Sequence, residues 1–432
     1  MTARTHWSSS AARGVATIAL ILACSPVALA AQKPDSTKAA LDSLAARLDR
    51  AEETIEMLKQ QLAAQGESAV KTKSGMALEF TGRVLMNAFA NSRRVNNADV
   101  PTTARPDTSA GPSNGGAGLE IRQTTLGIAL TSPNVLGAQF LGDLDLDFFG
   151  GQVSTIGGRT MPLIRLRTAR AILTWPHSEL LIGQEQPLVS NLNPVSLAGV
   201  GTPVFTAAGN LWYWMPQVRY TIERPGKVRV GLQGAIVAPM TGETVGTFDT
   251  DFDAAERTRR PFLEGRVRLR WGEEDTQAEV GIGVHKGWIS PTRGTMLTND
   301  AITADALIPI GKRLELRGEY FTGHGMRVLG GGQVGQLYGT DGAAIGGWGG
   351  WAQLNAKPSS RVLVGAGIGT DQPDIEYLPA TGRRGNTTSE LHTIVHPGGP
   401  LVLSFEWRRT TTEYATRSWT NDHFNVGLGF EF

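Results

Sequence analysis

The sequence contains one cysteine, Cys24, carries a net charge of only +1, and has no long hydrophobic run beyond its first thirty residues. A single cysteine excludes a disulfide framework. The balanced charge gives no electrostatic reason to expect a nucleic-acid partner. Without about 18 consecutive apolar residues, membrane-spanning helices are excluded beyond the N-terminal segment. The hydrophobic share is an ordinary 41%, which a barrel of membrane strands can also have because half of each strand is polar.

The start of the chain has the layout of a secretory signal peptide. The basic residues Arg4 and Arg13 precede an apolar run over residues 14–23, and small residues follow at 28–30. This run is too short to span a membrane as a helix. We therefore expect a signal peptide over residues 1–31 that is removed from the mature protein.

A second interpretation of this segment stays open. Residues 20–24 loosely resemble a lipoprotein cleavage box, which would leave a lipidated Cys24 at the mature N-terminus. Leu22 fits that box poorly, and a good signal-peptidase site follows it. If Cys24 is removed, the mature chain has no cysteine, which suits an exported protein that does not rely on disulfides.

Residues 32–66 contain a regular apolar repeat. Its spacing alternates between three and four residues, as the a and d positions of a coiled coil do. A lone helix of this length is marginal in water, so the repeat predicts an oligomerisation stalk. An amphipathic helix docked on the protein's own barrel is the alternative, and the mixed apolar residues do not specify dimer or trimer. The predicted contact residues are Leu41, Leu44, Leu48, Ile55, Leu58 and Leu62.

From residue 76 onward, segments of about ten residues alternate apolar and polar side chains between turn residues, as transmembrane β-strands do. We predict an all-β fold, a sixteen-stranded antiparallel transmembrane barrel over residues 76–432, preceded by a linker at 67–75. The predicted strands are 76–91, 118–131, 135–149, 162–175, 178–186, 211–223, 227–238, 261–272, 276–287, 300–309, 313–322, 343–356, 361–369, 386–396, 400–411 and 418–432.

The connections between these strands alternate in length. Seven are short, such as 224–226, and eight are long, such as 187–210. An up-and-down barrel gives this alternation when its periplasmic turns are tight and its outer loops are not. A soluble sandwich would not sort its loops in this way. The pattern predicts a multi-pass barrel in a bacterial outer membrane, surrounded by lipid.

The last strand gives a rule for which side chains face lipid. Its even positions, from Phe424 to Phe432, are large and apolar, and its odd positions are small or polar. Alternate residues of a strand lie on opposite faces. A strand that ends on an aromatic residue also resembles the C-terminal signal of outer-membrane barrels. Trp212, Tyr213 and Trp214 come at a predicted strand start, where an aromatic girdle is expected.

The same parity places rows of charged side chains inside the barrel, because charge on the lipid face is costly. Arg170 breaks the parity of its strand, which predicts a β-bulge near Thr168 or a slip in register. The rows either pair across the wall or form an anion path, since the planar guanidinium binds carboxylates in pairs. The predicted pore-lining residues are Asp143, Asp145, Asp147, Arg165, Arg167, Arg219, Arg266, Arg268 and Arg270.

Three short stretches, residues 121–127, 183–186 and 215–220, together with the predicted stalk, resemble the DcaP-like trimeric porins. The resemblance implies a homotrimer of sixteen-stranded barrels. It also implies passive diffusion of small anionic solutes, dicarboxylates in particular.

The third long connection, residues 187–210, carries no charge in 24 residues. Outer loops meet water and are usually more polar. In general porins this loop folds inward, and we expect the same here. A neutral inward loop would leave the arginines uncompensated at the narrowest point, which favours anions.

Two other classes of function stay as alternatives. His423 lies near Ser418 and Asp422, which would suit a barrel hydrolase if the three side chains formed a triad. A structural or adhesive barrel without conductance is the other alternative. His392 and His396 share one strand face about 13 Å apart, which is too far for a shared metal. We expect no enzymatic activity, no metal and no cofactor.

Overall fold

The computed structural model describes residues 70–71, 76–108, 114–152, 160–243, 251–273, 276–292, 294–340 and 342–432. The chain divides into two units, Met1–Glu67 and Ser68–Phe432, and the described residues belong to the second. The predicted signal peptide with Cys24, and the predicted stalk with Leu41, Leu44, Leu48, Ile55, Leu58 and Leu62, lie outside the described residues.

The described residues form one sheet of eighteen strands and a few short helical turns. No helix within them is long and apolar enough to cross a membrane. The strands are β1 (Val70–Lys71), β2 (Ala77–Arg93), β3 (Asn114–Glu120), β4 (Thr125–Val135), β5 (Ala138–Asp147), β6 (Arg165–Trp175), β7 (Ser178–Glu185), β8 (Met215–Arg224), β9 (Val228–Val237), β10 (Phe262–Trp271), β11 (Ala278–Ile289), β12 (Leu297–Ile310), β13 (Leu314–His324), β14 (Gly346–Ser359), β15 (Val362–Pro373), β16 (Arg383–Gly398), β17 (Leu401–Tyr414) and β18 (Ser418–Glu431). The helical turns are η2 (Glu256–Thr258), η4 (Met326–Leu329), α2 (Gly332–Gly335) and η5 (Ile375–Tyr377).

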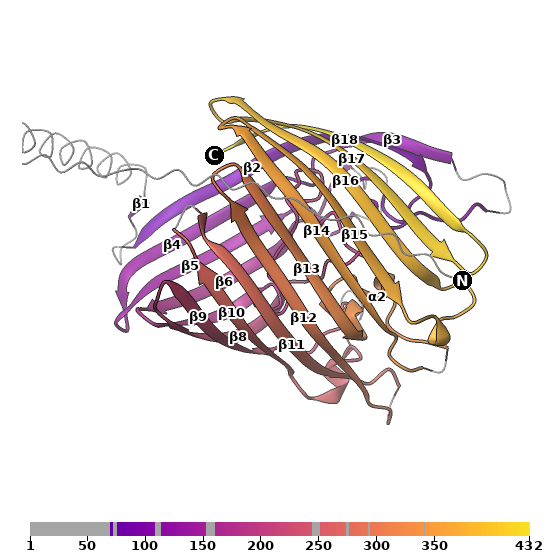
Figure 1. Cartoon of the computed structure of the whole chain (residues 1–432), viewed down its shortest axis with the longest axis horizontal. Coiled ribbons are helices and arrows are strands. Elements are labelled where there is room, and N and C mark those ends of the chain that lie inside the picture. Colours follow the sequence, from indigo (N-terminus) through magenta and orange to yellow (C-terminus); the bar gives the residue numbers. More distant parts are fainter. Residues whose placement is uncertain are drawn as a thin grey trace, which may run out of the picture. The chain divides into compact units, whose positions relative to one another are not determined.

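The sheet closes on itself into a barrel. From β4 onward each strand pairs antiparallel with the next, and β18 pairs with β2 to complete the ring (Figure 1). β3 and β4 pair with the two halves of β2, so together they make one wall strand. The two-residue β1, which lies in the predicted linker, pairs with the start of β2. Sixteen wall strands and one short extra strand result.

The predicted barrel is confirmed, because each of the sixteen predicted strands coincides with a wall strand. Two details differ. The predicted strand 118–131 is interrupted at residues 121–124, where the chain leaves the ladder. The last long connection shrinks to residues 415–417, because β17 continues to Tyr414 and β18 begins at Ser418.

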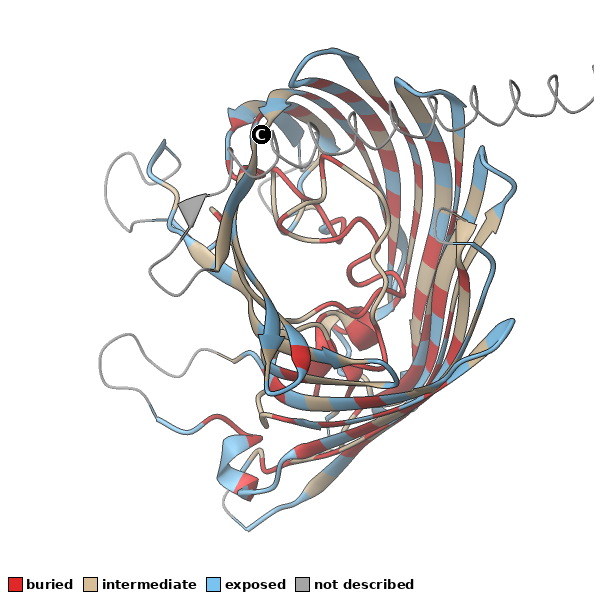
Figure 2. Cartoon of the chain, turned by 90° about the vertical axis from the view of Figure 1, so that its left-hand side faces the viewer, coloured by how far each residue is buried: buried red, intermediate tan, exposed pale blue. Residues whose placement is uncertain are grey.

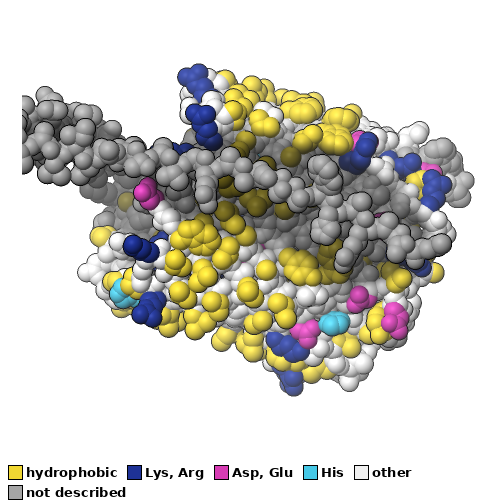
Figure 3. All heavy atoms as spheres, viewed as in Figure 1, with side chains coloured by type: hydrophobic (Ala, Val, Ile, Leu, Met, Phe, Trp, Pro, Cys, Tyr) yellow, Lys and Arg dark blue, Asp and Glu magenta, His cyan; other side chains and the backbone are white. Residues whose placement is uncertain are grey.

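The outside of the barrel is apolar, as the parity rule predicts. Along β18 the even-numbered residues from Phe424 to Phe432 are between 42% and 56% exposed, whereas Asn425 is buried inside. Val267 and Leu269 on β10 are likewise exposed, and the intervening Arg268 points inward to contact Glu223. Figure 3 shows hydrophobic side chains spread over the outer face of the strands. A closed barrel with such an exterior is suited to a lipid surround.

The loop that connects β7 and β8, residues 186–214, enters the barrel and is called the inner loop below. Its residues Leu188 and Leu211 are buried in a cluster with Phe262 and Phe321 of the wall. Figure 2 shows buried loop segments inside the ring of strands. The expectation of an inward third loop is therefore confirmed, and the inner loop divides the lumen.

Candidate pore constriction

One side of the inner loop is bonded to the wall through its own backbone. Inward polar side chains accept hydrogen bonds from backbone N–H groups of the loop. These bonds join Leu188 to Glu264 (2.6 Å), Leu192 to Glu319 (2.8 Å), Val195 to Gln353 (2.8 Å) and Gly201 to Gln123 (2.9 Å). Irregular backbone inside a barrel has no strand partner, so its N–H groups need such acceptors. The inner loop is thereby held at a fixed place in the lumen.

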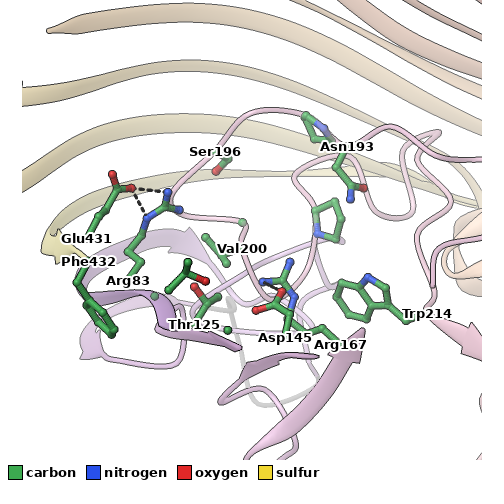
Figure 4. Close-up of a pocket in the computed structure, with 16 residues that line it drawn as sticks. Arg83, Thr125, Asp145, Arg167, Asn193, Ser196, Val200, Trp214, Glu431 and Phe432 are labelled. Carbon is green, nitrogen blue, oxygen red and sulfur yellow. Dashed lines mark hydrogen bonds and ion pairs between the residues drawn. The ribbon is translucent and has the colours of Figure 1, made fainter. Parts of the chain in front are cut away.

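Open space lies on the other side of the inner loop, towards strands β2, β4, β5 and β6. Two adjoining pockets of about 440 and 530 Å³ are found there. They share the lining residues Thr81, Gly127, Asp145, Arg167, Asn193 and Trp214. Figure 4 shows the first pocket, with Arg83 and Glu431 joined by an ion pair at one edge. The space is bounded by the neutral loop on one side and by charged wall residues on the other.

A β-bulge in β6 shapes the charged side of these pockets. Leu166 pairs with Leu146 and Thr168 pairs with Asp145, so Arg167 has no partner residue on β5. The predicted bulge is confirmed. Because the extra residue restores the parity, Arg170 also points inward. It forms hydrogen bonds to both carboxylate oxygens of Asp143 (2.8 and 2.5 Å).

Of the two possibilities for the charged rows, pairing across the wall is found between the aspartates of β5 and the arginines of β6. Arg165 binds Asp147 in a two-pronged arrangement (3.0 and 2.5 Å) and donates to the Gly201 carbonyl of the inner loop (2.5 Å). Arg167 is held more loosely, with ion pairs to Asp145 and Asp147 at 3.2 and 3.7 Å. Its buried Nε has no hydrogen-bond partner within the described part of the chain. Among the arginines of β6, Arg167 therefore has the weakest contacts with the residues of the wall.

The aromatic residues 212–214 lie inside the barrel, so their predicted place in an outer girdle is wrong. β8 begins only at Met215, which leaves them at the end of the inner loop. Trp212 is buried and packs edge-on against Trp214, with ring centroids 5.2 Å apart. The guanidinium carbons of Arg165 and Arg167 lie 5.0 and 5.1 Å from the Trp214 ring centroid, within cation–π range.

The second group of predicted arginines is divided between wall and lumen. Arg266 is fully buried and binds Asp305 (2.8 Å), Gln233 (2.7 Å) and Glu279 (2.6 Å). A guanidinium so enclosed belongs to the wall. Arg268 and Arg270 are partly exposed and share Glu223.

Arg219, the last predicted arginine, has a different kind of partner. It donates to the Gln186 carbonyl of the inner loop (2.7 Å) and to the Gln217 side chain (3.0 Å). No ion pair joins it to a carboxylate within the described residues. Its hydrogen bonds go to neutral oxygens, and the carboxylates of Glu185, Glu264 and Glu179 act on its charge from a longer range.

Three partners of the arginines, Glu223, Glu185 and Asp305, are missing from the predicted site. The parity rule places Glu223 and Asp305 inward, because each alternates with an apolar neighbour, but it does not place Glu185, which lies between Gln184 and Gln186. Which arginine each one meets depends on the register between strands, and the pattern of a single strand does not contain that information.

The alternative active and metal sites are not assembled. His423 lies inside and contacts Asn91 (3.0 Å), whereas its neighbour Asp422 pairs with Arg409 (2.9 Å) on the opposite face of β18. Ser418 is exposed at the start of that strand. His392 and His396 contact separate carboxylates. The described residues include no cluster of side chains suited to a metal ion.

No family model and no curated protein matches this chain. Several solved structures do resemble it in fold. The outer membrane channel DcaP of Acinetobacter baumannii is 18% identical, with a TM-score of 0.65 over 84% of this chain and 100% of that one. An anion-selective porin from Comamonas acidovorans is 15% identical, with a TM-score of 0.53 over 83% and 100%. OprB of Pseudomonas putida is 11% identical, with a TM-score of 0.52 over 82% and 94%.

The chain has the fold of the outer-membrane porins. The resemblance to DcaP-like porins that the short motifs indicated is thus confirmed at the level of the fold. A closed sixteen-stranded barrel with an apolar exterior is a multi-pass protein of the outer membrane.

Proposed function

We propose that this protein is a porin that lets small hydrophilic solutes diffuse passively across the outer membrane. The observation that carries the proposal is the pair of adjoining pockets between the inner loop and strands β2 to β6. Their lining is polar and charged, so water and ions can occupy them. The inner loop narrows the lumen without filling it, which suits a size-limited channel.

A preference for anions such as dicarboxylates is part of this proposal, and unequal pairing of the inner charges supports it. Glu223 is the shared partner of three guanidinium groups, at Arg229, Arg268 and Arg270. Arg219 donates its hydrogen bonds to neutral oxygens and forms no ion pair among the described residues. The inner loop adds no carboxylate to offset them. The proposed pore-lining residues are Asp143, Asp145, Asp147, Arg165, Arg167, Arg219, Arg268 and Arg270, with Arg266 acting as their support.

Recording from planar bilayers tests both parts of the proposal. The purified protein is expected to give discrete, ohmic conductance steps. In a KCl gradient, the sign of the reversal potential should show that chloride is more permeable than potassium. A lipid-embedded barrel that never conducts would instead support the structural or adhesive alternative. Cation selectivity would leave the porin intact and remove the anion preference.

We also propose a homotrimer, assembled with the help of the predicted stalk at residues 32–66. The heptad pattern of that segment and the fold resemblance to porins support it. Chemical cross-linking in mild detergent should capture trimers of the mature chain and mostly smaller species of a chain lacking residues 32–66. Equal trimer yields from both chains would remove the stalk from the assembly.

A further inference from the structure

Trp214 occupies an unusual place for a tryptophan in a membrane barrel. Tryptophan is normally enriched where the barrel surface meets the lipid headgroups. Trp214 instead lines both pockets beside the inner loop and is only half-buried. Figure 4 shows its indole beside Arg167, with Asn193 of the inner loop nearby. A flat π-surface and a guanidinium thus border the same open space.

The indole is held in place from two directions. Trp212 packs edge-on against it at 5.2 Å with an interplanar angle of 76°. Arg165 lies 5.0 Å from its centroid and is itself fixed by Asp147 and the Gly201 carbonyl. A site whose side chains are locked by their neighbours loses little freedom when a ligand binds.

Arg167 is the charged residue beside Trp214, and it can exchange its present partners for a solute. Among the described residues it has no hydrogen bond to a carboxylate, and its ion pairs to Asp145 and Asp147 are long, at 3.2 and 3.7 Å. Arg165 and Arg170, by contrast, are each bound by an aspartate at 2.5 Å. A solute carboxylate in the pocket can therefore bind Arg167 at a smaller cost than it could at either neighbour.

We propose that Trp214 and Arg167 form a binding site for small aromatic carboxylates within the pore. Arg167 binds the carboxylate, and the solute ring packs against the indole in an offset or edge-on arrangement. The pocket volumes of about 440 and 530 Å³ are in the usual range for small-molecule sites. This inference rests on the proposed function, since it requires an open pore, and it adds a class of solute to that function.

Benzoate and cyclohexanecarboxylate make a sharp test, because they match in charge and nearly in size but only benzoate is aromatic. Each is added to the wild-type protein in planar bilayers, and the concentration that halves the chloride current is measured. Benzoate should block at a concentration roughly two- to tenfold lower, from the extra attraction between aromatic rings. Equal blocking concentrations in the wild type would overturn the proposal.

Variants separate the contribution of the Trp214 ring to block from that of the Arg167 charge. Trp214→Leu should make the two blocking concentrations equal, and Trp214→Phe should keep part of the difference and serves if the leucine variant folds poorly. Arg167→Gln should weaken both blockers by the same factor. Trp348→Leu is the matched control, because Trp348 is exposed on the outer face of β14. An unchanged benzoate advantage in Trp214→Leu would also overturn the proposal.

The same recordings distinguish this proposal from the one it rests on. Failure of the porin proposal appears as a protein that gives no channels at all. Failure of the anion preference appears in the KCl reversal potential, before any aromatic solute is added. Failure of the aromatic site appears only in the ratio of the two blocking concentrations.

Discussion

Replacing Glu319 by alanine should release the inner loop from the wall and raise the single-channel conductance severalfold. Glu319 is buried on β13 and accepts four hydrogen bonds. The donors are Leu192 N (2.8 Å), Ser190 Oγ (2.9 Å), Asn210 Nδ2 (3.1 Å) and Trp351 Nε1 (3.2 Å). Each buried donor left without an acceptor costs about 1–3 kcal/mol. Leu192 N and Trp351 Nε1 would lose the one acceptor they have among the described residues, whereas Ser190 and Asn210 keep backbone acceptors. We therefore expect this part of the loop to move into the lumen water.

Conductance and proteolysis measure this release independently. The segment 187–210 has no lysine or arginine, so trypsin cannot report on it. Chymotrypsin can, at Leu192, Leu197 and Phe205, which are shielded when the loop is clamped. In Glu319→Ala the open-channel current should become larger and noisier, and chymotrypsin should cut within the loop while the barrel stays intact.

Two further variants control for the loss of a carboxylate. Glu319→Gln keeps one acceptor oxygen and should give an intermediate phenotype. Asp422→Ala removes a carboxylate that pairs with the exposed Arg409 on the outer face, so conductance and cleavage should not change. If Glu319→Ala conducts and resists chymotrypsin as the wild type does, Glu319 does not hold the loop.

The barrel itself could be predicted from sequence because its signal is local. A two-residue period and turn residues are contained in each segment, so strand number, strand position and inward or outward direction follow. The bulge in β6 could be predicted for the same reason, since Arg170 violates the period of its own strand. The residues of β18 obey that rule from Phe424 onward.

The constriction could be predicted only in part, because its contacts join distant segments. Glu319 and Leu192 are separated by 127 residues, and no repeat or motif connects them. The inner loop carries no carboxylate, which predicts uncompensated arginines at the narrowest point, yet the wall supplies Glu264 and Glu319 to the backbone of the loop. Residues 212–214 were assigned to a girdle because the start of β8 was placed four residues too early, at 211 instead of Met215.

These contacts change the expected origin of selectivity. The sequence suggested a row of uncompensated arginines opposite a neutral loop. Around the two pockets, Arg165, Arg167 and Arg170 instead face acidic residues at Asp143, Asp145, Asp147 and Glu185. Positive charge exceeds negative charge elsewhere, where Glu223 is shared by Arg229, Arg268 and Arg270 and Glu279 is a second partner of Arg268. Any anion preference should therefore arise mainly at that cluster and should be moderate.

Replacing both Arg268 and Arg270 by glutamate should move the pore from anion towards cation selectivity. The double change turns two positive charges beside Glu223 into two negative ones, so the local field changes sign. The reversal potential in a KCl gradient should shift towards the potassium equilibrium potential, and the chloride-to-potassium permeability ratio should fall severalfold. Arg268→Gln with Arg270→Gln should give about half the shift and avoids repulsion with Glu223.

Arg266 is left unchanged in this experiment because its side chain is enclosed by Asp305, Glu279 and Gln233, and reversing it would bury an unpaired charge. The matched control is Arg409→Glu, at an exposed position outside the barrel, which should leave the reversal potential unchanged. If the shift in reversal potential becomes smaller between 0.1 and 1 M KCl, its origin is electrostatic, because the Debye length falls from about 10 to 3 Å over that range. If the double glutamate variant keeps the wild-type reversal potential, Arg268 and Arg270 serve only to bind Glu223, and the solute path avoids them.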